Sequence, residues 1–467
     1  MKALLLEAAI IVDLPILMEK KSNAFGTEPL GKLLTAQAVP ASIGILVMSI
    51  YGIVDTIFVG RFVGSLGIGA ITVVLPITFL IGSIGMAIGV GGASIISRAL
   101  GKGNPEKAYL TFANQVLLTS SLAIAFLVFG LIFIDEILAV FGGKGEILEP
   151  AKAYFKIVLY GVPFLAWAMM SNNIIRAEGY PRVAMLTLVV AAVANIILDP
   201  IFIIWLDMGI EGAAWATAIA YGISAAYTTY YFLFGKGELK IKLRLLRPDW
   251  KIIREIFAIG SVTLARQGTI SVLSIVLNNS LFAYGGELGL STYGIINRFM
   301  MFANFPVLGI TQGFVPIVGY NYGANLEERV QKIINISIRS ATLIALATFA
   351  AIMIGADQLV LIFSSEPALL EAAAPALRMA FLATPLLAIS LIGSAFFQAI
   401  GKAMPALLLA LSKQGIFLIP LVLILPLFLD INGIWISFPL ADIGAATVTY
   451  WYMAKKGRRI RFRPKKT

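Results

Sequence analysis

The sequence contains no cysteine and no histidine among its 467 residues. Without cysteine there are no disulfides and no thiolate metal sites, and without histidine any proton relay must use carboxylates, tyrosine or lysine. Charged residues are also scarce at 13% of the chain, whereas hydrophobic residues make up 59%. Soluble domains have about 25% charged and roughly 45–50% apolar residues. The composition therefore predicts a polytopic membrane protein.

Sequence signatures of enzymes are missing as well. There is no HExxH, GxSxG or Cys/His cluster, and the glycine-rich runs at 64–69 and 89–92 have neither a preceding strand nor a following GK[ST]. We therefore expect a protein that is not an enzyme and has no cofactor. The net charge of +11 does not indicate a nucleic-acid partner, because the lysines and arginines collect in short loops and in the C-terminal tail.

Long apolar runs divide the chain into segments of about 20 or more residues without alternation, which predicts membrane-spanning helices. The fold class we expect is an all-α membrane protein with about twelve transmembrane helices. The expected spans are 33–62, 67–98, 109–134, 152–176, 182–206, 211–234, 252–284, 288–319, 331–356, 372–400, 403–429 and 432–454. Basic residues lie in alternate loops, so we expect a multi-pass protein of the cell membrane with both termini in the cytoplasm.

The two halves of the chain are related. Asn104 in GNPEKA and Asn325 in GANLEER are 221 positions apart, and Gly179 and Gly401 are 222 apart. Six helices per half give both halves the same orientation, a parallel repeat whose binding site usually lies between the halves. We predict an N-terminal leader (1–29, with Met18 as a plausible start), an N-lobe (30–234), a cytoplasmic linker (235–251), a C-lobe (252–455) and a basic cytoplasmic tail (456–467).

Two aspartates interrupt apolar runs of the N-lobe, Asp55 in ILVMSIYGIVDTIFVG and Asp199 in VVAAVANIILDPIFIIW. An ionised Asp at the centre of a membrane helix costs roughly 2.5–3.5 kcal/mol, so each is expected to face protein or a wet cavity. Asn195 shares a helix face with Asp199. Counting from the helix ends brings Asp55, this pair and Thr217 to a similar depth. Because two nearby carboxylates cannot both ionise cheaply, we expect the four residues to form a cation-coupling site that shares a proton or holds a Na⁺ ion.

A structural interpretation of the same residues stays open. In it, Asp199 bonds a neighbouring helix and Asp55 faces water in a vestibule. Pro40 frees the carbonyl of Ala36, which makes it the expected hinge of the first helix. Tyr51 lies one turn below Asp55 on the same helix face.

The second half lacks the acid pair at the equivalent positions, but it has polar residues of its own in apolar runs. Those singled out are Arg266, Arg298, Lys413 and Asp442. We expect them to form a C-lobe polar network that locks helices together. A second coupling site is the alternative interpretation.

Several motifs resemble those of the multidrug and toxic compound extrusion (MATE) family. They are YGIVDTIFVGR in the first helix, RAEGYPRVAM, NIILDP and GAAWAT, together with INRFMMFANFPVLGITQGFVPIVGYNYGA in the eighth-helix region. The resemblance covers roughly residues 30–455, and NIILDP with the first-helix aspartate resembles the DinF-type branch. It implies two pseudo-symmetric six-helix bundles around a central cleft.

The same resemblance implies a cation-coupled antiporter, driven by H⁺ or Na⁺, that exports amphipathic or cationic organic compounds by alternating access. By motif, Asp55, Asn195, Asp199 and Thr217 match the family's coupling cluster and its Na⁺ position. Less sharp matches give the candidate substrate-binding residues Tyr51, Tyr154, Asn172 and Asn173. The expected partners are small organic substrates and the lipid bilayer, and the expected state is a monomer.

Two alternatives remain. A lipid or lipid-linked oligosaccharide flippase of the same superfamily would need a basic cavity, for which Arg266 and Arg298 could serve. A passive channel is disfavoured, because channels are usually built around a pore ring of symmetric subunits.

Overall fold

The computed structural model describes residues 22–241, 246–363 and 366–457. The expected leader up to residue 21, linker positions 242–245 and the tail from residue 458 lie outside the described residues. All regular structure within the described ranges is helical, and ten helical segments there are long and apolar enough to cross a membrane. One of the ten, α10 (Trp250–Gly323), is two helices joined at Gly286, and α9 (Gly209–Phe234) is a further long helix outside that set. Counted this way, the described part of the chain has twelve long helices, so the predicted all-α membrane fold is confirmed.

The chain forms two compact units that do not simply follow the order of the sequence. Of the described residues, the first unit consists of 22–28 and of those within Ile43–Thr263, and the second of Pro29–Ser42 and of those from Leu264 to Gly457. Each unit therefore takes the beginning of one long helix from the other half of the sequence. The two boundaries inside helices, after Ser42 and after Thr263, are 221 positions apart, which is the offset of the sequence repeat.

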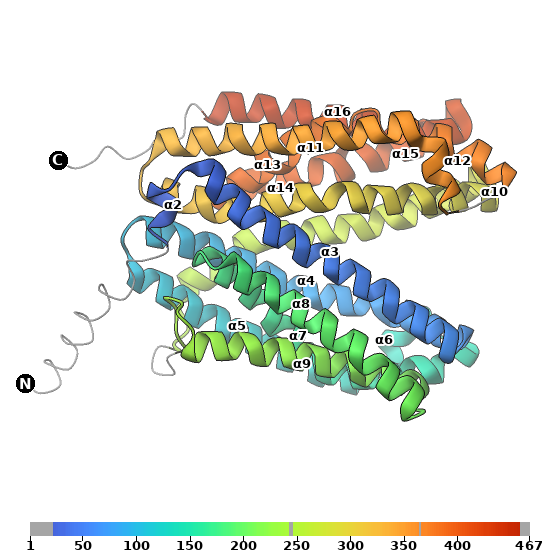
Figure 1. Ribbon diagram of the computed structural model, residues 1–467, viewed down its shortest axis with the longest axis horizontal. Helices are drawn as coiled ribbons and strands as arrows, with labels where there is room; N and C mark the ends of the chain where they lie inside the picture. Colours follow the sequence, from blue (N-terminus) through green and yellow to red (C-terminus); the bar gives the residue numbers. More distant parts are fainter. Residues whose placement is uncertain (1–21, 242–245, 364–365, 458–467) are drawn as a thin grey trace, which may run out of the picture. The chain divides into compact units, whose positions relative to one another are not determined.

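The first unit is a bundle in which α7 packs along α4 and α9, and α8 packs along α9 (Figure 1). Its elements are α2 (Ala24–Thr27), α3 (Leu30–Phe62) from Ile43 onward, α4 (Ser65–Gly101), α5 (Pro105–Ile132), α6 (Ile134–Val140), η1 (Gly145–Ile147), α7 (Leu148–Ala177), α8 (Pro181–Pro200), the π-helical turn η2 (Ile201–Trp205), α9 and the start of α10 up to Thr263. A β-carbon on Gly85 would lie 2.7 Å from the carbonyl oxygen of Ala166. The absence of that atom lets α4 and α7 approach closely, as small residues do between membrane helices.

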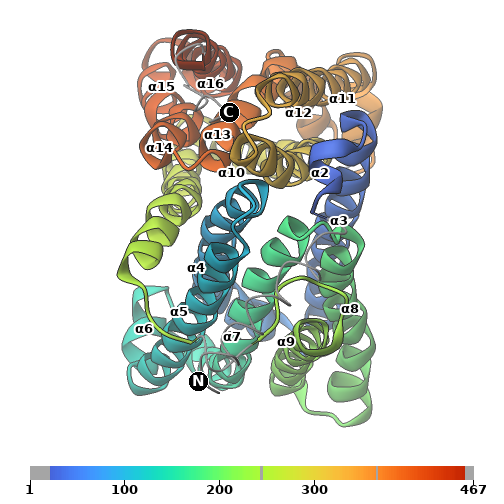
Figure 2. The same cartoon turned by 90° about the vertical axis from the view of Figure 1, so that its left-hand side faces the viewer.

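The second unit packs α13 against α14 and α16, and α16 against η5 (Figure 2). Its elements are the start of α3 up to Ser42, α10 from Leu264 onward, α11 (Glu327–Leu361), α12 (Pro367–Phe381), η4 (Thr384–Leu386), α13 (Leu387–Ala399), α14 (Ala403–Leu411), the π-helical η5 (Ser412–Leu418), α15 (Ile419–Ile424) and α16 (Pro426–Gly457). Buried apolar side chains such as Leu277, Leu377 and Ile434 form its core.

Matching glycines end matching helices in the two halves. Gly179 follows α7 with a φ of 88°, and Gly401 follows α13 with a φ of 79°. This left-handed region penalises any residue with a β-carbon, so glycine is the favoured residue just after a helix. The glycine pair that indicated the sequence repeat therefore follows a helix in the same left-handed conformation in each half.

The helix α3 is held closely by both units. In the second unit, β-carbons on Gly309 and Gly313 would lie 2.8 Å from the carbonyl oxygen of Ala38 and 3.0 Å from its amide nitrogen. In the first unit, Gly44 packs on Leu188. Pro40 lies inside α3, two residues before the boundary at which the helix passes from one unit to the other.

Candidate functional site

The four residues expected to couple a cation lie on three helices of the first unit. Asp55 comes from α3, Asn195 and Asp199 from α8, and Thr217 from α9. All four are buried, and Asp199 is fully inaccessible to solvent. Asp199 directly precedes Pro200 and the π-helical turn η2. Single π-helical turns inside helices occur frequently at functional sites.

The side chains of these residues meet. The Asn195 Nδ2 atom donates to Asp199 Oδ1 at 3.4 Å and to Thr217 Oγ1 at 3.3 Å. The carboxyl groups of Asp55 and Asp199 lie close enough for the charge of one to affect the other. The sequence argument from helix depth therefore brings together residues that the structure also brings together. Their role as a coupling site stays a prediction.

Three acceptor oxygens in this cluster have no donor. Asp55 Oδ1, Asp199 Oδ2 and Asn195 Oδ1 are buried and accept no hydrogen bond from any described residue. Buried acceptors are normally satisfied by a donor or by ordered water, so an unpaired set at one place has room for a proton or a cation. A proton on one carboxyl group would supply a donor, and a cation would be bound by the oxygens directly.

The donor set fits a singly charged hard cation as well as a proton. Two carboxylates and the neutral oxygens of Asn195 and Thr217 are all oxygen ligands, which hard cations prefer. Within the described residues, no group of three or more Asp, Glu, His or Cys side chains could hold a metal ion. The chemistry of the site therefore suits H⁺ or Na⁺ and does not choose between them.

Tyrosines surround the acid pair. Tyr154 on α7 is buried, and its hydroxyl interacts with Thr217. Tyr51 on α3 interacts with Tyr221 on α9. Sequence reasoning missed Tyr221 as a member of this site. The available signal was its spacing, because Tyr221 follows Thr217 by four residues and so shares its helix face.

The two asparagines expected to bind substrate lie further along α7. The amide nitrogen of Asn172 donates to the carbonyl oxygen of Ala184, and its Oδ1 atom accepts from Arg176 Nη2 at 2.8 Å. Asn173 donates to the carbonyl oxygen of Met169 at 2.9 Å. Both side chains are engaged in packing contacts of α7, and their role in substrate binding stays a prediction.

Only two of the four expected C-lobe network residues contact each other. Lys413 Nζ lies 2.6 Å from Asp442 Oδ1. The Arg298 guanidinium instead lies 5.4 Å from the centre of the Phe363 ring. Neither Arg298 nor Arg266 forms an ion pair with any residue in the described ranges.

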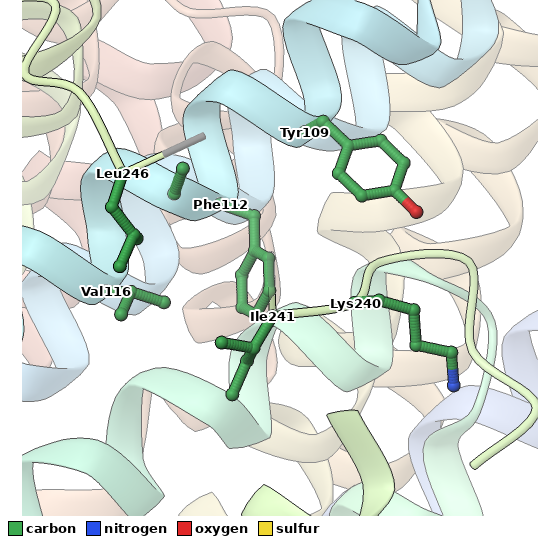
Figure 3. Close-up of a pocket in the computed structure, with 7 residues that line it drawn as sticks. Tyr109, Phe112, Val116, Lys240, Ile241 and Leu246 are labelled. Carbon is green, nitrogen blue, oxygen red and sulfur yellow. The ribbon is translucent and has the colours of Figure 1, made fainter. Parts of the chain in front are cut away.

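A small pocket lies elsewhere in the first unit, between α5 and the linker (Figure 3). Its two polar side chains are occupied, since the Tyr109 hydroxyl donates to the carbonyl oxygen of Glu238 and Lys240 donates to that of Gly235. The remaining lining is apolar and consists of Phe112, Ala113, Val116, Ile241 and Leu246. The pocket is separate from the acid pair and offers no charged group that lacks a partner.

Comparison with known proteins places this arrangement in context. A sequence model of the MatE family matches residues 40–201 and 264–424, one stretch in each half of the chain. The multidrug export protein MepA of Staphylococcus aureus is 29% identical over 418 residues, which is 90% of this chain and 92% of that protein. MepA of Staphylococcus saprophyticus is 28% identical and covers 87% of this chain and 89% of its own length.

Solved structures give the same result. A MATE protein in complex with MaL6 has a TM-score of 0.89 at 26% identity and covers 94% of this chain and 99% of that one. An outward-facing MATE family transporter of the MOP superfamily has a TM-score of 0.88 at 26% identity, with coverages of 95% and 99%. A MOP superfamily transporter from Pyrococcus furiosus, described as having a binding pocket of reverse polarity, has a TM-score of 0.87 at 27% identity, with coverages of 94% and 98%.

Proposed function

Because the chain belongs to the MATE family of membrane transporters, we propose that it is a multidrug exporter of amphipathic or cationic organic compounds, driven by inward H⁺ or Na⁺. The likeness to the MepA multidrug export proteins supports the substrate class. The observation that carries the coupling part of the proposal is the buried cluster of Asp55, Asp199 and their unpaired oxygens. The motif NIILDP supports an assignment to the DinF-type branch.

The coupling follows from the charge of the acid pair. With both carboxylates ionised, repulsion between Asp55 on α3 and Asp199 on α8 favours their separation. A proton or a Na⁺ ion arriving from outside cancels one of the two negative charges, which relieves the repulsion and draws α3 onto α8. An ion can drive transport only if it and the organic compound bias the same two-state element in opposite directions. We assign α3 as that element.

The position of Pro40 supports this assignment. The helix α3 belongs to the second unit before Ile43 and to the first unit after it, and Pro40 lies just before this boundary. Proline removes a backbone hydrogen bond inside a helix, so bending is cheapest near it. We propose that α3 bends here as the transporter alternates between inward-facing and outward-facing states, as a monomer with both termini in the cytoplasm.

The test measures efflux of a fluorescent organic cation from membrane vesicles while a pH gradient and a Na⁺ gradient are imposed separately. We expect one gradient to drive transport and Asp55→Asn or Asp199→Asn to reduce that driven transport at least tenfold. The matched control is Asp135→Asn, since Asp135 is an exposed carboxylate paired with Lys152. Full gradient-driven efflux by both cluster variants would end the coupling hypothesis.

A lipid or lipid-linked oligosaccharide flippase is the second candidate. The observation in its favour is that the guanidinium groups of Arg266 and Arg298 have no carboxylate partner in the described ranges, which leaves them available to an anionic headgroup. Flipping of a fluorescent anionic lipid that is lost in Arg266→Gln, without any efflux of organic cations, would favour this candidate over the exporter.

A further inference from the structure

The second unit contains a charge pair within its own membrane-spanning helices. Lys413 belongs to the π-helical η5, in the span Ala403–Ile424, and Asp442 lies in the span Pro426–Lys455. Their charged atoms are 2.6 Å apart. The sequence argument assigned this pair to a structural network, but the other two members of that network are absent from it.

Structural stabilisation alone explains such a pair poorly. Taking two charges out of water costs several kcal/mol per ion in real proteins, and an apolar pair of similar size is often as stable or more stable. Ionisable residues inside membrane spans are therefore functional candidates by default. The π-helical backbone around Lys413 is a second feature that recurs at functional sites.

The two partners differ in how firmly they are held. The Asp442 side chain is 5% exposed and follows Ala441 and Phe438 on a buried face of α16, whereas the Lys413 side chain is 26% exposed. The lysine side chain is therefore the more accessible of the two partners. A lysine ammonium on its flexible four-carbon stem can leave more easily than the buried carboxylate.

Two other groups lie on the same two helical segments as the pair. The Gln414 Oε1 atom, next to Lys413 in η5, is buried and accepts no hydrogen bond from a described residue. Phe417 packs at Gly444, two residues after Asp442, with ring atoms 3.0 Å from the position of a β-carbon there. A carboxylate within a membrane span suits an organic cation that carries N–H donors, because hydrogen bonds between charged groups are stronger than neutral ones.

The first unit has no counterpart of this pair. At the repeat offset of 221, Lys413 corresponds to Ala192 and Asp442 to Tyr221. The pair is therefore specific to the second unit and separate from the Asp55 cluster.

We propose that Asp442 binds the N–H-bearing cationic group of an exported compound, and that Lys413 is a tethered cation that occupies this carboxylate until the compound displaces it. The inference rests on the proposed export of organic cations. It adds a second acidic site, which takes an ammonium or amidinium group rather than the coupling ion.

The test compares the binding of proflavine, a flat fluorescent cation with N–H donors, with that of tetraphenylphosphonium, which has none, to the purified full-length protein. Lys413→Met removes the internal competitor, so the dissociation constant for proflavine should fall about tenfold. Asp442→Asn should raise that constant at least tenfold. The double variant should resemble Asp442→Asn. The ratio of the proflavine to the tetraphenylphosphonium constant should change in both single variants.

The matched control is Arg378→Met. It breaks a different ion pair of the same unit, in which the Arg378 guanidinium lies 2.6 Å from the more exposed carboxylate of Asp357. Its proflavine binding should equal that of the wild type. If Lys413→Met fails to fold because Asp442 is left unpaired, the apolar double variant Lys413→Met with Asp442→Leu has no such charge and should fold but bind proflavine at least tenfold more weakly.

Two further outcomes separate this inference from the proposed function. If the wild type exports and binds organic cations but Asp442→Asn binds proflavine normally, the inference is wrong and the proposed function stands. If neither the wild type nor Lys413→Met binds any organic cation, both are overturned.

Discussion

Glu178 is predicted to make the stability of the first unit depend on pH. It directly follows α7, outside the membrane span, and is fully buried. Its two carboxylate oxygens accept from the Tyr231 hydroxyl at 3.0 Å and from the backbone N–H of Leu239 at 2.5 Å. Burial raises the pKa of Glu178 to about 8, although these hydrogen bonds oppose the shift. The nearby carboxyl of Glu238, whose pKa is also raised by burial, adds repulsion.

The direction of the pH effect follows from this raised pKa. In the unfolded chain Glu178 has its ordinary pKa of 4.5, so between pH 4.5 and about 8 the folded protein binds a proton that the unfolded chain has released. The contribution of Glu178 to stability is therefore complete below pH 4.5 and is lost as the pH rises to about 8. At 1.36 kcal/mol per pH unit over this interval, the loss is about 5 kcal/mol.

Glu178→Gln removes this dependence because a glutamine has no proton to lose, while its side-chain oxygen can still accept a hydrogen bond. We expect the variant to have a higher melting temperature than the wild type at pH 9 and a similar or slightly lower one at pH 5. Thermal unfolding of the purified protein in detergent at both pH values measures the difference. The matched control is Glu146→Gln, an exposed position in the same unit. A variant whose melting temperature falls with pH as steeply as that of the wild type would refute the reasoning.

Three further predictions concern packing, ion binding and bending. Gly92→Ala should reduce the free energy of unfolding by roughly 1–3 kcal/mol and so lower the melting temperature, because its β-carbon would lie 2.0 Å from the Gln115 side chain. Gly52→Ala, whose β-carbon would have nothing within 4 Å, should leave the melting temperature unchanged. Asn195→Ala should weaken binding of the coupling ion about tenfold in an ion titration without changing the affinity for organic cations, because Asn195 Oδ1, one of the unpaired oxygens of the cluster, is lost. Pro40→Ala should slow efflux severalfold at unchanged ion affinity, and an unchanged efflux rate would argue against a hinge there.

The fold could be predicted largely from apolar runs and the internal repeat, because both reflect requirements of the bilayer. A helix must span about 30 Å of hydrocarbon, and six helices per half fix the orientation of the halves. Hydropathy alone indicates α9 less clearly as a membrane span. Its tyrosines, threonines and early Glu211 make it less apolar than the ten segments that are apolar enough to cross a membrane.

The candidate site was predictable in part. Asp55 and Asp199 stand out because a carboxylate in an apolar run is rare, and Asn195 and Thr217 follow from helix spacing and depth. Tyr221 did not stand out, because a tyrosine in a membrane helix is common and its importance lies in its contact with another helix. The exchange of helix ends between the units was likewise hidden, since the apolar pattern of α3 does not say which unit covers which turn.

The repeat itself suggests how such sites can be found. Gly179 and Gly401 match across the halves because a left-handed backbone at the end of a helix penalises other residues in both copies. Within α3 and within α10, the chain passes from one unit to the other at positions that are 221 residues apart, because the two halves share their helix packing. A side chain inside the bundle is under no such backbone constraint and can change with the chemistry it performs. Two positions are therefore informative: Asp199, which falls opposite Ile419 or Pro420, and Lys413, which falls opposite Ala192. Both break the repeat at places where the backbone does not require it.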